Sequence, residues 1–462
     1  RLEAIRTLAR RKNKSALDHI ERLLLDTDAN VILAAVKAAG QLGAVRATDT
    51  LLEFTRGSDR TLITASLDSL RKLQDNRAVS VALNALDYQE TQSAAIEYLT
   101  VFGTPDQIDF IVEAAARNPA YEIQSKVVQA LSTWQTHFAD ARERIQTAIS
   151  IVHGNNGQPL AWHVSGPLST AAADESMEEL KTKTGTSLNL SGKAGAATVI
   201  AEGFPPALSF NETTDDKSVR LAWTTIRVNR PTNIELLTSA TGGLSLWMPG
   251  GEIHAREKPG QFLPDSDRIP VRLETGTSLL IARIEPDGGN AARFHLRFRR
   301  HSSKAEHERL IAHALKTDGN VDRGRKVFAN VEKSSCIRCH RMGIEGGRIG
   351  PDLTGIGSRF SRIHLIESIL EPSRTVAPSY KTIVVVLEDG KVMTGIRVSE
   401  SDKILVIGDN QGKLHQIPVA NVAEIATQTV STMPEGLEKK LTDREFTDLL
   451  AFLESETSAR SK

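Results

Sequence analysis

Cysteine is scarce in this chain of 462 residues, which contains only Cys336 and Cys339. Two thiols cannot build a disulfide framework, so the fold does not depend on one. No apolar run approaches the roughly 20 residues that a membrane-spanning helix needs. Neither sign of charge is in excess, because 57 Lys and Arg balance 57 Asp and Glu. This balance gives no support to a nucleic-acid or acidic-membrane partner.

The length of the chain predicts about three domains, at roughly 100–200 residues for each. The expected fold class is multidomain α + β, with boundaries where the apolar periodicity changes. We expect helical repeats at 1–152, an antiparallel β-sandwich at 155–302, a connector helix at 303–318 and a last domain, which contains both cysteines, at 319–457. Helical spacing already begins at Leu2. We therefore expect a fragment whose targeting segment lies upstream.

Apolar triplets at positions i, i+3 and i+6 recur in the first region after 34, 31, 29 and 32 residues. Each period has room for two helices, and Gly43 and Gly103 follow two of the triplets, where a helix C-terminus is expected. Such repeats stack into an α-solenoid. The region resembles HEAT-like repeats, which implies a spacer or docking surface. The triplets are Leu2/Ile5/Leu8, Val36/Ala39/Leu42, Leu67/Leu70/Leu73, Ile96/Leu99/Phe102 and Val128/Leu131/Trp134.

Strand-like alternation replaces the helical spacing in the second region. Leu244 and Leu246 point to one side and Trp247 to the other, and turn-forming glycine pairs separate such runs. This pattern predicts an antiparallel β-sandwich. The stretches 162–167 and 239–254 are similar to galactose-binding-like jelly-roll modules, which would imply carbohydrate as a partner.

Acidic residues that such modules often carry before this strand are missing here, where Ala240, Thr241 and Gly242 stand instead. Carbohydrate is therefore only a weak expectation. The strand that contains Phe294, Leu296 and Phe298 has basic residues on its other side. We expect its arginines to form a solvated strand face; they are Arg293, Arg297, Arg299 and Arg300.

The two cysteines belong to the run Cys336-Ile337-Arg338-Cys339-His340. Two thiols three positions apart can each add across one vinyl group of a haem, and the adjacent imidazole then falls under the iron. A Cys-x-x-Cys-His run is typical of c-type haem attachment. Three alternatives remain: a zinc site, which needs two further ligands, a thioredoxin-like dithiol, and chance.

Two helices are predicted on either side of this motif. Val321, Gly324, Phe328 and Val331 share one face of the first, and the glycine predicts a close helix crossing. The last helix starts at a capping box of Thr442 and Glu445, with Leu441 and Phe446 as its hydrophobic staple. Its apolar stripe consists of Phe446, Leu449, Leu450 and Leu453.

A second axial ligand is expected, because iron in cytochromes c is typically held by His and Met. Of the five methionines, Met433 lies in a Pro-stiffened loop just before the final helix, and it is our choice. Met393 sits in an alternating strand, where core packing is expected. His364, on a helix over 362–370, is the chief rival, although an exposed surface histidine is expected there. His415 lies on a predicted strand.

From Gly324 to Leu453 the chain resembles the C-terminal haem-binding module of large planctomycete proteins, a cytochrome c class I-like domain. The matching motifs include the stretches 324–328, 336–340, 350–357, 371–374, 431–437 and 450–453. The resemblance implies one haem c bound covalently through Cys336 and Cys339, with iron ligands His340 and Met433. It also implies that the Pro351 carbonyl accepts a hydrogen bond from His340. Further haem contacts are expected from Phe328, Leu353, Ile356, Phe360 and Arg359.

Between about 380 and 427 alternating runs and turns at Asp389-Gly390 and 409–412 predict a small β-unit inserted into this all-α domain. The expected function is electron transfer, as the relay of a larger periplasmic or secreted redox protein. Its expected partner is a redox protein or an upstream dehydrogenase domain. Two alternatives stay open: a haem enzyme acting on peroxide or another small ligand, and a scaffold that binds polysaccharide or protein.

Overall fold

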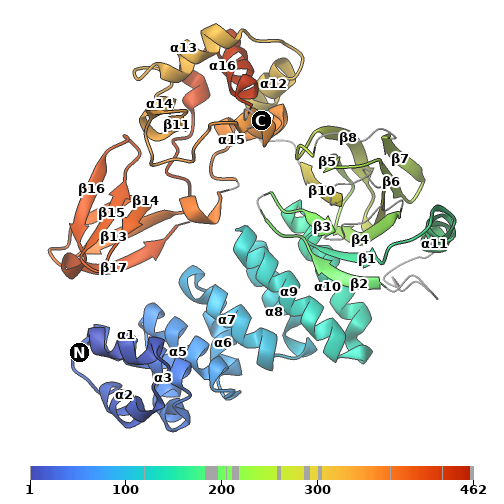
Figure 1. Cartoon of the computed structure of the whole chain (residues 1–462). Helices are drawn as coiled ribbons and strands as arrows, with labels where there is room; N and C mark the ends of the chain where they lie inside the picture. The colour runs from blue at the N-terminus through green and yellow to red at the C-terminus, as the bar shows by residue number, and fades with distance from the viewer. Residues whose placement is uncertain are drawn as a thin grey trace.

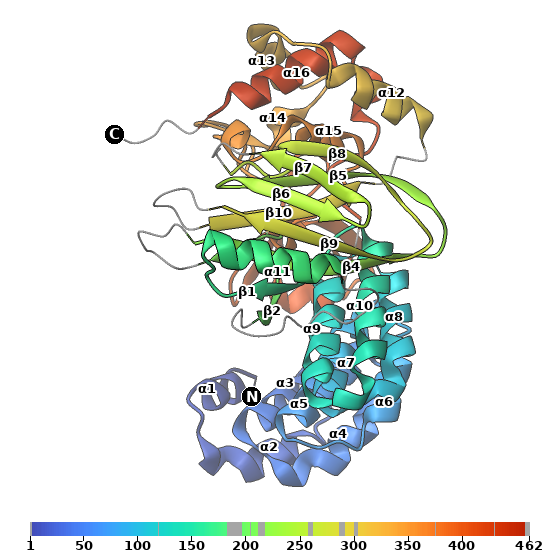
Figure 2. The ribbon, with the colours of Figure 1, turned by 90° about the vertical axis from the view of Figure 1, so that its right-hand side faces the viewer.

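The computed structural model describes residues 2–118, 120–182, 196–203, 205–210, 218–256, 262–285, 292–299, 304–374, 376–428 and 430–457. A curved array of helices is followed by two antiparallel sheets and then by a mixed C-terminal part (Figure 1). Turned by a quarter, the molecule shows the helical array, the sheets and the C-terminal helices as successive tiers (Figure 2).

Paired helices build the N-terminal array, as the periodic triplets predicted. The triplets fall on or directly after the helices α1, α3, α5, α7 and α9, which pack against one another in that order. Gly43 ends α3 with φ +81°, a conformation that glycine adopts at helix C-termini without steric cost. The helices are α1 (Leu2–Arg10), α2 (Leu17–Leu23), α3 (Ala29–Leu42), α4 (Thr48–Thr55), α5 (Arg60–Lys72), α6 (Val79–Ala85), α7 (Gln89–Phe102), α8 (Ile108–Arg117), α9 (Tyr121–His137) and α10 (Arg142–Asn156).

Two antiparallel sheets follow, with strand orders β2-β1-β4-β9-β6-β7 and β3-β10-β5-β8. They share one hydrophobic core, in which Trp162 of the first meets Phe294 of the second at 5.2 Å between ring centroids. The helix α11 (Thr170–Thr182) packs on Trp223 from the outside. The strands are β1 (Ala161–Ser165), β2 (Ala196–Ile200), β3 (Leu208–Phe210), β4 (Arg220–Val228), β5 (Thr232–Ala240), β6 (Leu244–Met248), β7 (Gly251–Arg256), β8 (Asp267–Leu273), β9 (Gly276–Ile284) and β10 (Ala292–Arg299).

The arginine face of β10 is not solvated, and that prediction was wrong. Arg299 is 2% exposed and forms ion pairs with Glu308 and Glu367 of the C-terminal part. Arg297 reaches Glu367 as well, at 2.5 Å. Only Arg293 is exposed as expected, and Arg300 lies outside the described residues. The face is buried because the C-terminal part packs on it, which alternation along a strand cannot reveal.

The C-terminal part starts with α12 (Ala305–Ala314), which lies within the predicted connector. The next helix, α13, crosses the last helix, α16, with Gly324 and Phe328 buried between them. Val321 and Val331 are exposed, contrary to prediction; the helix ends at Ala329, so Val331 lies beyond it. The capping box of Thr442 and Glu445 is present, as predicted. The elements are α13 (Val321–Ala329), α14 (Cys336–Cys339), β11 (Arg341–Met342), β12 (Glu345–Gly346), α15 (Arg362–Leu370) and α16 (Asp443–Ser455).

A five-stranded antiparallel sheet is inserted between α15 and α16, as the alternating runs predicted. Its strand order is β16-β15-β14-β13-β17, and Gly390 and Gly412 take positive φ in its predicted turns. The sheet has its own small core and extends back toward the helical array (Figure 1). The strands are β13 (Thr382–Leu387), β14 (Val392–Glu400), β15 (Ile404–Gly408), β16 (Leu414–Pro418) and β17 (Val422–Thr427).

Candidate functional site

The two cysteines lie on the short helix α14, directly before His340. Both thiols are free and half-buried. Burial raises the pKa of each thiol above its ordinary value, so both are protonated at neutral pH. Among the described residues no group of three His, Cys, Asp or Glu side chains is arranged to hold a metal ion. A closed zinc site would need such a group around Cys336 and Cys339.

The ring of His340 forms a hydrogen bond with the backbone carbonyl of a proline. Its Nδ1 lies 3.0 Å from the Pro351 oxygen. Because a carbonyl can only accept, Nδ1 carries the hydrogen, and the lone pair is on Nε2. Burial lowers the pKa of His340, which keeps the ring neutral. Gly350 leaves room for the ring, because a β-carbon there would lie 2.7 Å from Cε1 of His340.

Most of the apolar residues expected to contact a haem belong to one hydrophobic cluster. Phe328 and Ile356 are buried in it, while Cys336, Leu353, Phe360 and Met433 are half-buried at its margin. Arg359 does not join them. It is exposed, and its Nη2 donates to the backbone carbonyls of Asp352 at 2.7 Å and Thr354 at 3.3 Å.

Hydrogen bonds fix the loop that carries Met433. The Met433 amide donates to Oγ of Ser431 at 3.1 Å, and the Ser431 amide donates to Oγ of Ser373 at 3.2 Å. The hydroxyls of Thr382 and Thr432 lie 2.8 Å apart. Met393, by contrast, packs against the core of the inserted sheet, as expected.

The prediction of an exposed His364 was wrong. The ring stacks on Phe360 at 4.3 Å between centroids, and Nδ1 lies 3.2 Å from Oδ2 of Asp265. The histidine is covered because the four-stranded sheet packs against α15. His415 lies on β16, as predicted, where its Nε2 is 2.6 Å from Oδ2 of Asp409.

The inserted sheet touches the cysteine motif through the ends of β15 and β16. A β-carbon at Gly408 would lie 2.5 Å from Cγ1 of Ile349. A β-carbon at Gly412 would lie 3.0 Å from the carbonyl oxygen of Arg338. The hairpin between the two strands therefore covers one side of the segment that contains Cys339.

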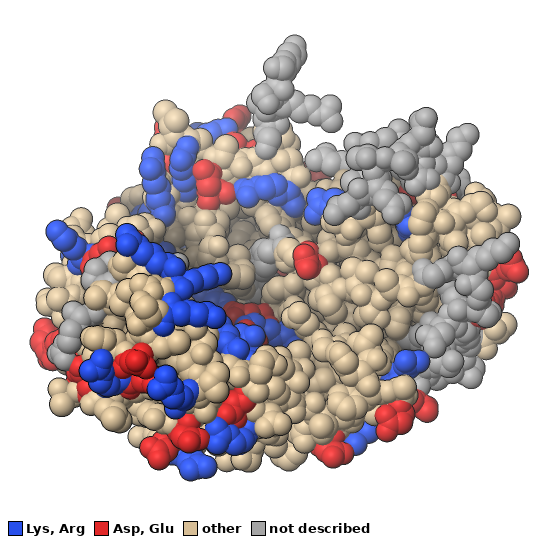
Figure 3. Space-filling view, turned by 60° about the horizontal axis from the view of Figure 1, so that its bottom comes forward, with Lys and Arg blue, Asp and Glu red and all other residues tan. Residues whose placement is uncertain are grey.

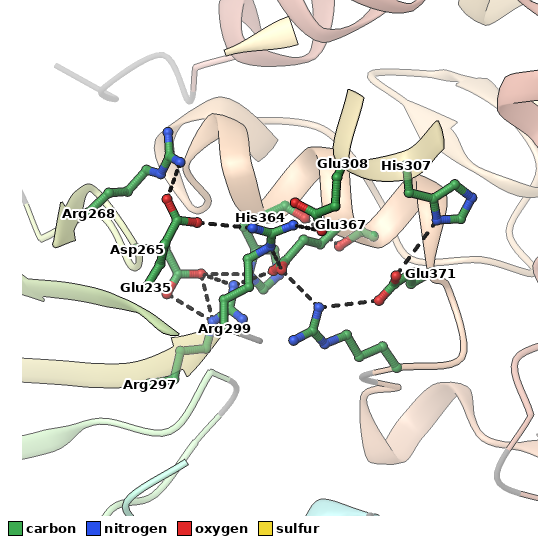
Figure 4. Close-up of polar contacts among 12 residues, drawn as sticks. Glu235, Asp265, Arg268, Arg297, Arg299, His307, Glu308, His364, Glu367 and Glu371 are labelled. Carbon is green, nitrogen blue, oxygen red and sulfur yellow. Dashed lines mark hydrogen bonds and ion pairs between the residues drawn. The ribbon is translucent and has the colours of Figure 1, made fainter. Parts of the chain in front are cut away.

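A buried ionic network joins the four-stranded sheet to α15, and sequence reasoning missed it (Figure 4). Asp265 is fully buried and accepts from Nε2 of His295 at 2.9 Å and from Nη2 of Arg297 at 2.7 Å. Burial alone would raise the pKa of Asp265. The charge of Arg297 and the hydrogen bonds from His295 and His364 outweigh it and hold that pKa well below its ordinary value.

A cavity of about 1030 Å³ lies where the helical array, the sheets and the C-terminal part meet. Residues of α5 and α7 and the start of α9 line one side, and His364, Glu367 and Arg374 line another. β17 contributes Glu424 and its neighbours to a third side. The molecule is hollowed on this face, and lysine and arginine side chains gather beside the hollow (Figure 3).

Comparison with known proteins supports the helical repeats. Residues 1–71 match the HEAT repeats family, and the N-terminal helices of this chain are HEAT-like repeats. A curated cytochrome c-553-like protein of Synechocystis sp. is 32% identical over 71 residues, which is 15% of this chain and 63% of that protein. This chain thus covers less than two thirds of the length of that relative.

Solved structures give only slight likenesses. The complex of CpcE and CpcF of phycocyanin lyase from Nostoc sp. PCC7120 has 18% identity and a TM-score of 0.27, covering 33% of this chain and 71% of that one. A β-glucosidase from Kluyveromyces marxianus has 11% identity and a TM-score of 0.18, covering 23% and 14%. Neither carries an argument about function. None of the described helices combines the length and apolarity of a membrane span.

Proposed function

We propose that the C-terminal part binds one haem c through thioether bonds from Cys336 and Cys339, with His340 and Met433 as iron ligands, and that it transfers single electrons. The observation that carries this proposal is the ring of His340, which follows the two free thiols and is fixed through Nδ1 by the Pro351 carbonyl. That hydrogen bond leaves the lone pair on Nε2, on the side of the ring away from the Pro351 carbonyl, as a metal ligand requires. The similarity over 71 residues to a protein named cytochrome c-553-like also supports a cytochrome role.

The residues present suit a haem. Each thiol would add its S–H across one vinyl C=C bond, a step that needs no oxidant. The half-buried apolar side chains of Leu353, Phe360 and Met433 form the margin of a core that a flat apolar group would complete. Phe328 and Ile356 close the inner side of that margin and keep water out.

A bound haem c supplies a one-electron couple whose potential depends on its axial ligands and surroundings. The protein contributes a fixed imidazole, a fixed thioether and a low-dielectric environment. The Ser373–Ser431 hydrogen bond and the Thr382–Thr432 contact hold the Met433 loop in place. Because His340 and Met433 would both hold the iron and would leave no position for a substrate, we propose an electron carrier that serves a redox protein or a dehydrogenase domain outside the cytosol.

A redox titration tests this proposal. The chain would be produced in a periplasm with haem-ligation machinery and titrated optically between oxidised and reduced states. We expect one reversible one-electron transition and slow carbon monoxide binding to the reduced protein. Rapid carbon monoxide binding would show an open sixth position and would favour the enzyme alternative instead.

A further inference from the structure

Two histidines contact Asp265, and the first of them faces an acceptor at each ring nitrogen. Nδ1 of His295 lies 2.6 Å from the Pro206 carbonyl oxygen, and its Nε2 lies 2.9 Å from the Asp265 carboxylate. Both partners are hydrogen-bond acceptors. The ring is fully buried, so neither nitrogen faces the cavity.

His364 differs from His295 in the surroundings of one ring nitrogen. Its Nδ1 donates to Asp265, but no described residue is a partner for its Nε2. Its side chain is 13% exposed and lines the cavity between the three parts of the molecule. Water in the cavity can therefore add or remove the Nε2 proton while the bond from Nδ1 to Asp265 stays in place. Only the charge of the ring changes.

The charged groups nearest to His364 are paired with one another. Arg297 lies between Asp265 and Glu367, with its Nη2 at 2.7 Å and 2.5 Å from their carboxylates. Across the cavity, Lys381 of the inserted sheet pairs with Glu122 of the helical array at 2.5 Å. Among the described residues, the charged or titratable side chains that face the ring or line its cavity are Asp265, His295, Arg297, Arg299, Glu367, Glu371, Arg374, Lys381, Tyr121, Glu122, Lys37, Arg60, Asp68, Glu90, Glu97 and Glu424.

A single aromatic ring separates His364 from the candidate haem cluster. The planes of His364 and Phe360 are 15° apart and stacked. Phe360 belongs to the same cluster margin as Cys336 and Met433. A positive charge behind Phe360 stabilises a reduced haem over an oxidised one, because the oxidised state carries one more positive charge. By reciprocity, the electron stabilises the proton to the same extent.

We infer that His364 is a proton-exchange site linked to the oxidation state of the haem. This inference rests on the proposed function. When the donor protein supplies one electron, the fraction of His364 rings that carry a proton on Nε2 rises, and each added proton comes from cavity water. On oxidation the electron and the added proton leave again, so charge and atoms balance in each direction.

The test is the reduction potential of the haem-loaded full chain between pH 5 and pH 9, the range in which histidine changes charge. We expect the wild-type potential to fall as pH rises, with a total change on the order of three- to tenfold in the equilibrium constant for reduction. The reduction potential of His364→Gln should not show this pH dependence and should stay near the potential that the wild type has at high pH. The potential of His364→Lys should also be independent of pH in this range and should stay near the potential that the wild type has at low pH.

Two further histidines serve as matched controls. His19→Gln removes an exposed histidine of the helical array, and His415→Gln removes the other described histidine of the C-terminal part that pairs with an aspartate. Both controls should keep the wild-type pH dependence. If both His364 variants keep it, or if His415→Gln abolishes it, the inference is overturned.

A second measurement requires no variant to fold. Wild-type protein with isotope-labelled histidines would be titrated with pH in its oxidised and reduced states, and the ring signals would be followed by NMR. The His364 ring should titrate at a higher pH in the reduced state, and equal midpoints would overturn the inference. Intact mass separates the two claims: wild-type protein without a porphyrin adduct refutes the proposed function, whereas an adduct with equal midpoints refutes this inference alone.

Discussion

Gly324 lies so close to Asp448 that a β-carbon at position 324 would come within 1.9 Å of the Asp448 carbonyl oxygen. The contact joins α13 to α16 around the cluster that contains the candidate haem site. The Asp448 carboxylate strengthens it by accepting from Arg323 Nε at 2.6 Å and from the Asn320 amide at 2.7 Å. The crossing therefore depends on the absence of a side chain at one position.

Gly324→Ala should force the two helices apart. We expect the free energy of unfolding of the C-terminal part to fall by about 2–3 kcal/mol, the upper range for overpacking, measured by chemical denaturation. Gly57→Ala is the control, because a β-carbon at this exposed glycine would meet only the Phe54 carbonyl oxygen at 3.4 Å. Equal stability of the two variants would mean that the helices do not cross at Gly324.

Met433→Ala should remove one iron ligand without preventing haem attachment. We expect the oxidised protein to lose the red-edge absorption band of a thioether–iron bond, and the potential to fall. Met393→Ala should keep the band, because Met393 packs in the core of the inserted sheet. Retention of the band in Met433→Ala would refute the assignment of Met433.

Arg299→Met should leave three carboxylates without their shared partner. Arg299 is 2% exposed and pairs with Glu235 and Glu367 at 3.0 Å each, and also with Glu308. Removing one member of a buried network typically costs about 3–5 kcal/mol. We expect a loss of this size in thermal or chemical unfolding. Arg117→Met breaks an exposed pair with Asp87 and should cost less than about 1 kcal/mol.

The stability of the junction between the helical array and the first sheet should fall in acid. Nδ1 of the buried His153 donates to the Thr225 carbonyl at 3.0 Å, and Nε2 accepts from the Ala161 amide at 3.1 Å. Burial lowers the pKa of His153 from 6.5 to about 4. The folded state thus binds fewer protons than the unfolded state between these values, and stability is lost as pH falls through that window.

The size of this effect follows from the pKa difference and is on the order of 3 kcal/mol between pH 7 and pH 4. Between pH 7 and pH 4, the free energy of unfolding of His153→Asn should fall by less than that of the wild type, and the difference should equal this amount. Urea unfolding at each pH measures both losses. His137→Gln, at an exposed histidine, should follow the wild type. If His153→Asn shows the wild-type acid sensitivity, His153 is not its cause.

Features with local signals could be predicted from the sequence. The capping box of Thr442 and Glu445 involves groups three residues apart, and Gly43 ends α3 through its own backbone conformation. The close approach at Gly324 could be inferred because glycine inside a helix is costly unless packing requires it. The candidate haem attachment site could also be proposed from a local signal, since Cys336, Cys339 and His340 form one continuous motif.

Contacts between the parts could not be predicted in this way. Arg297 and Glu367 are 70 residues apart, and the alternation in β10 shows only that Arg297 points away from Phe298. Nothing local indicates that α15 covers that face. For the same reason His364 was expected at the surface, although Asp265, which is 99 residues away in the sequence, contacts its ring.

Covalent haem attachment is tested most directly by the intact mass of the denatured protein, made in a periplasm with haem-ligation machinery. The account predicts the mass of the chain plus one porphyrin, lost in a Cys336→Ser/Cys339→Ser double variant. A wild-type chain of unmodified mass, folded and produced under these conditions, would contradict it.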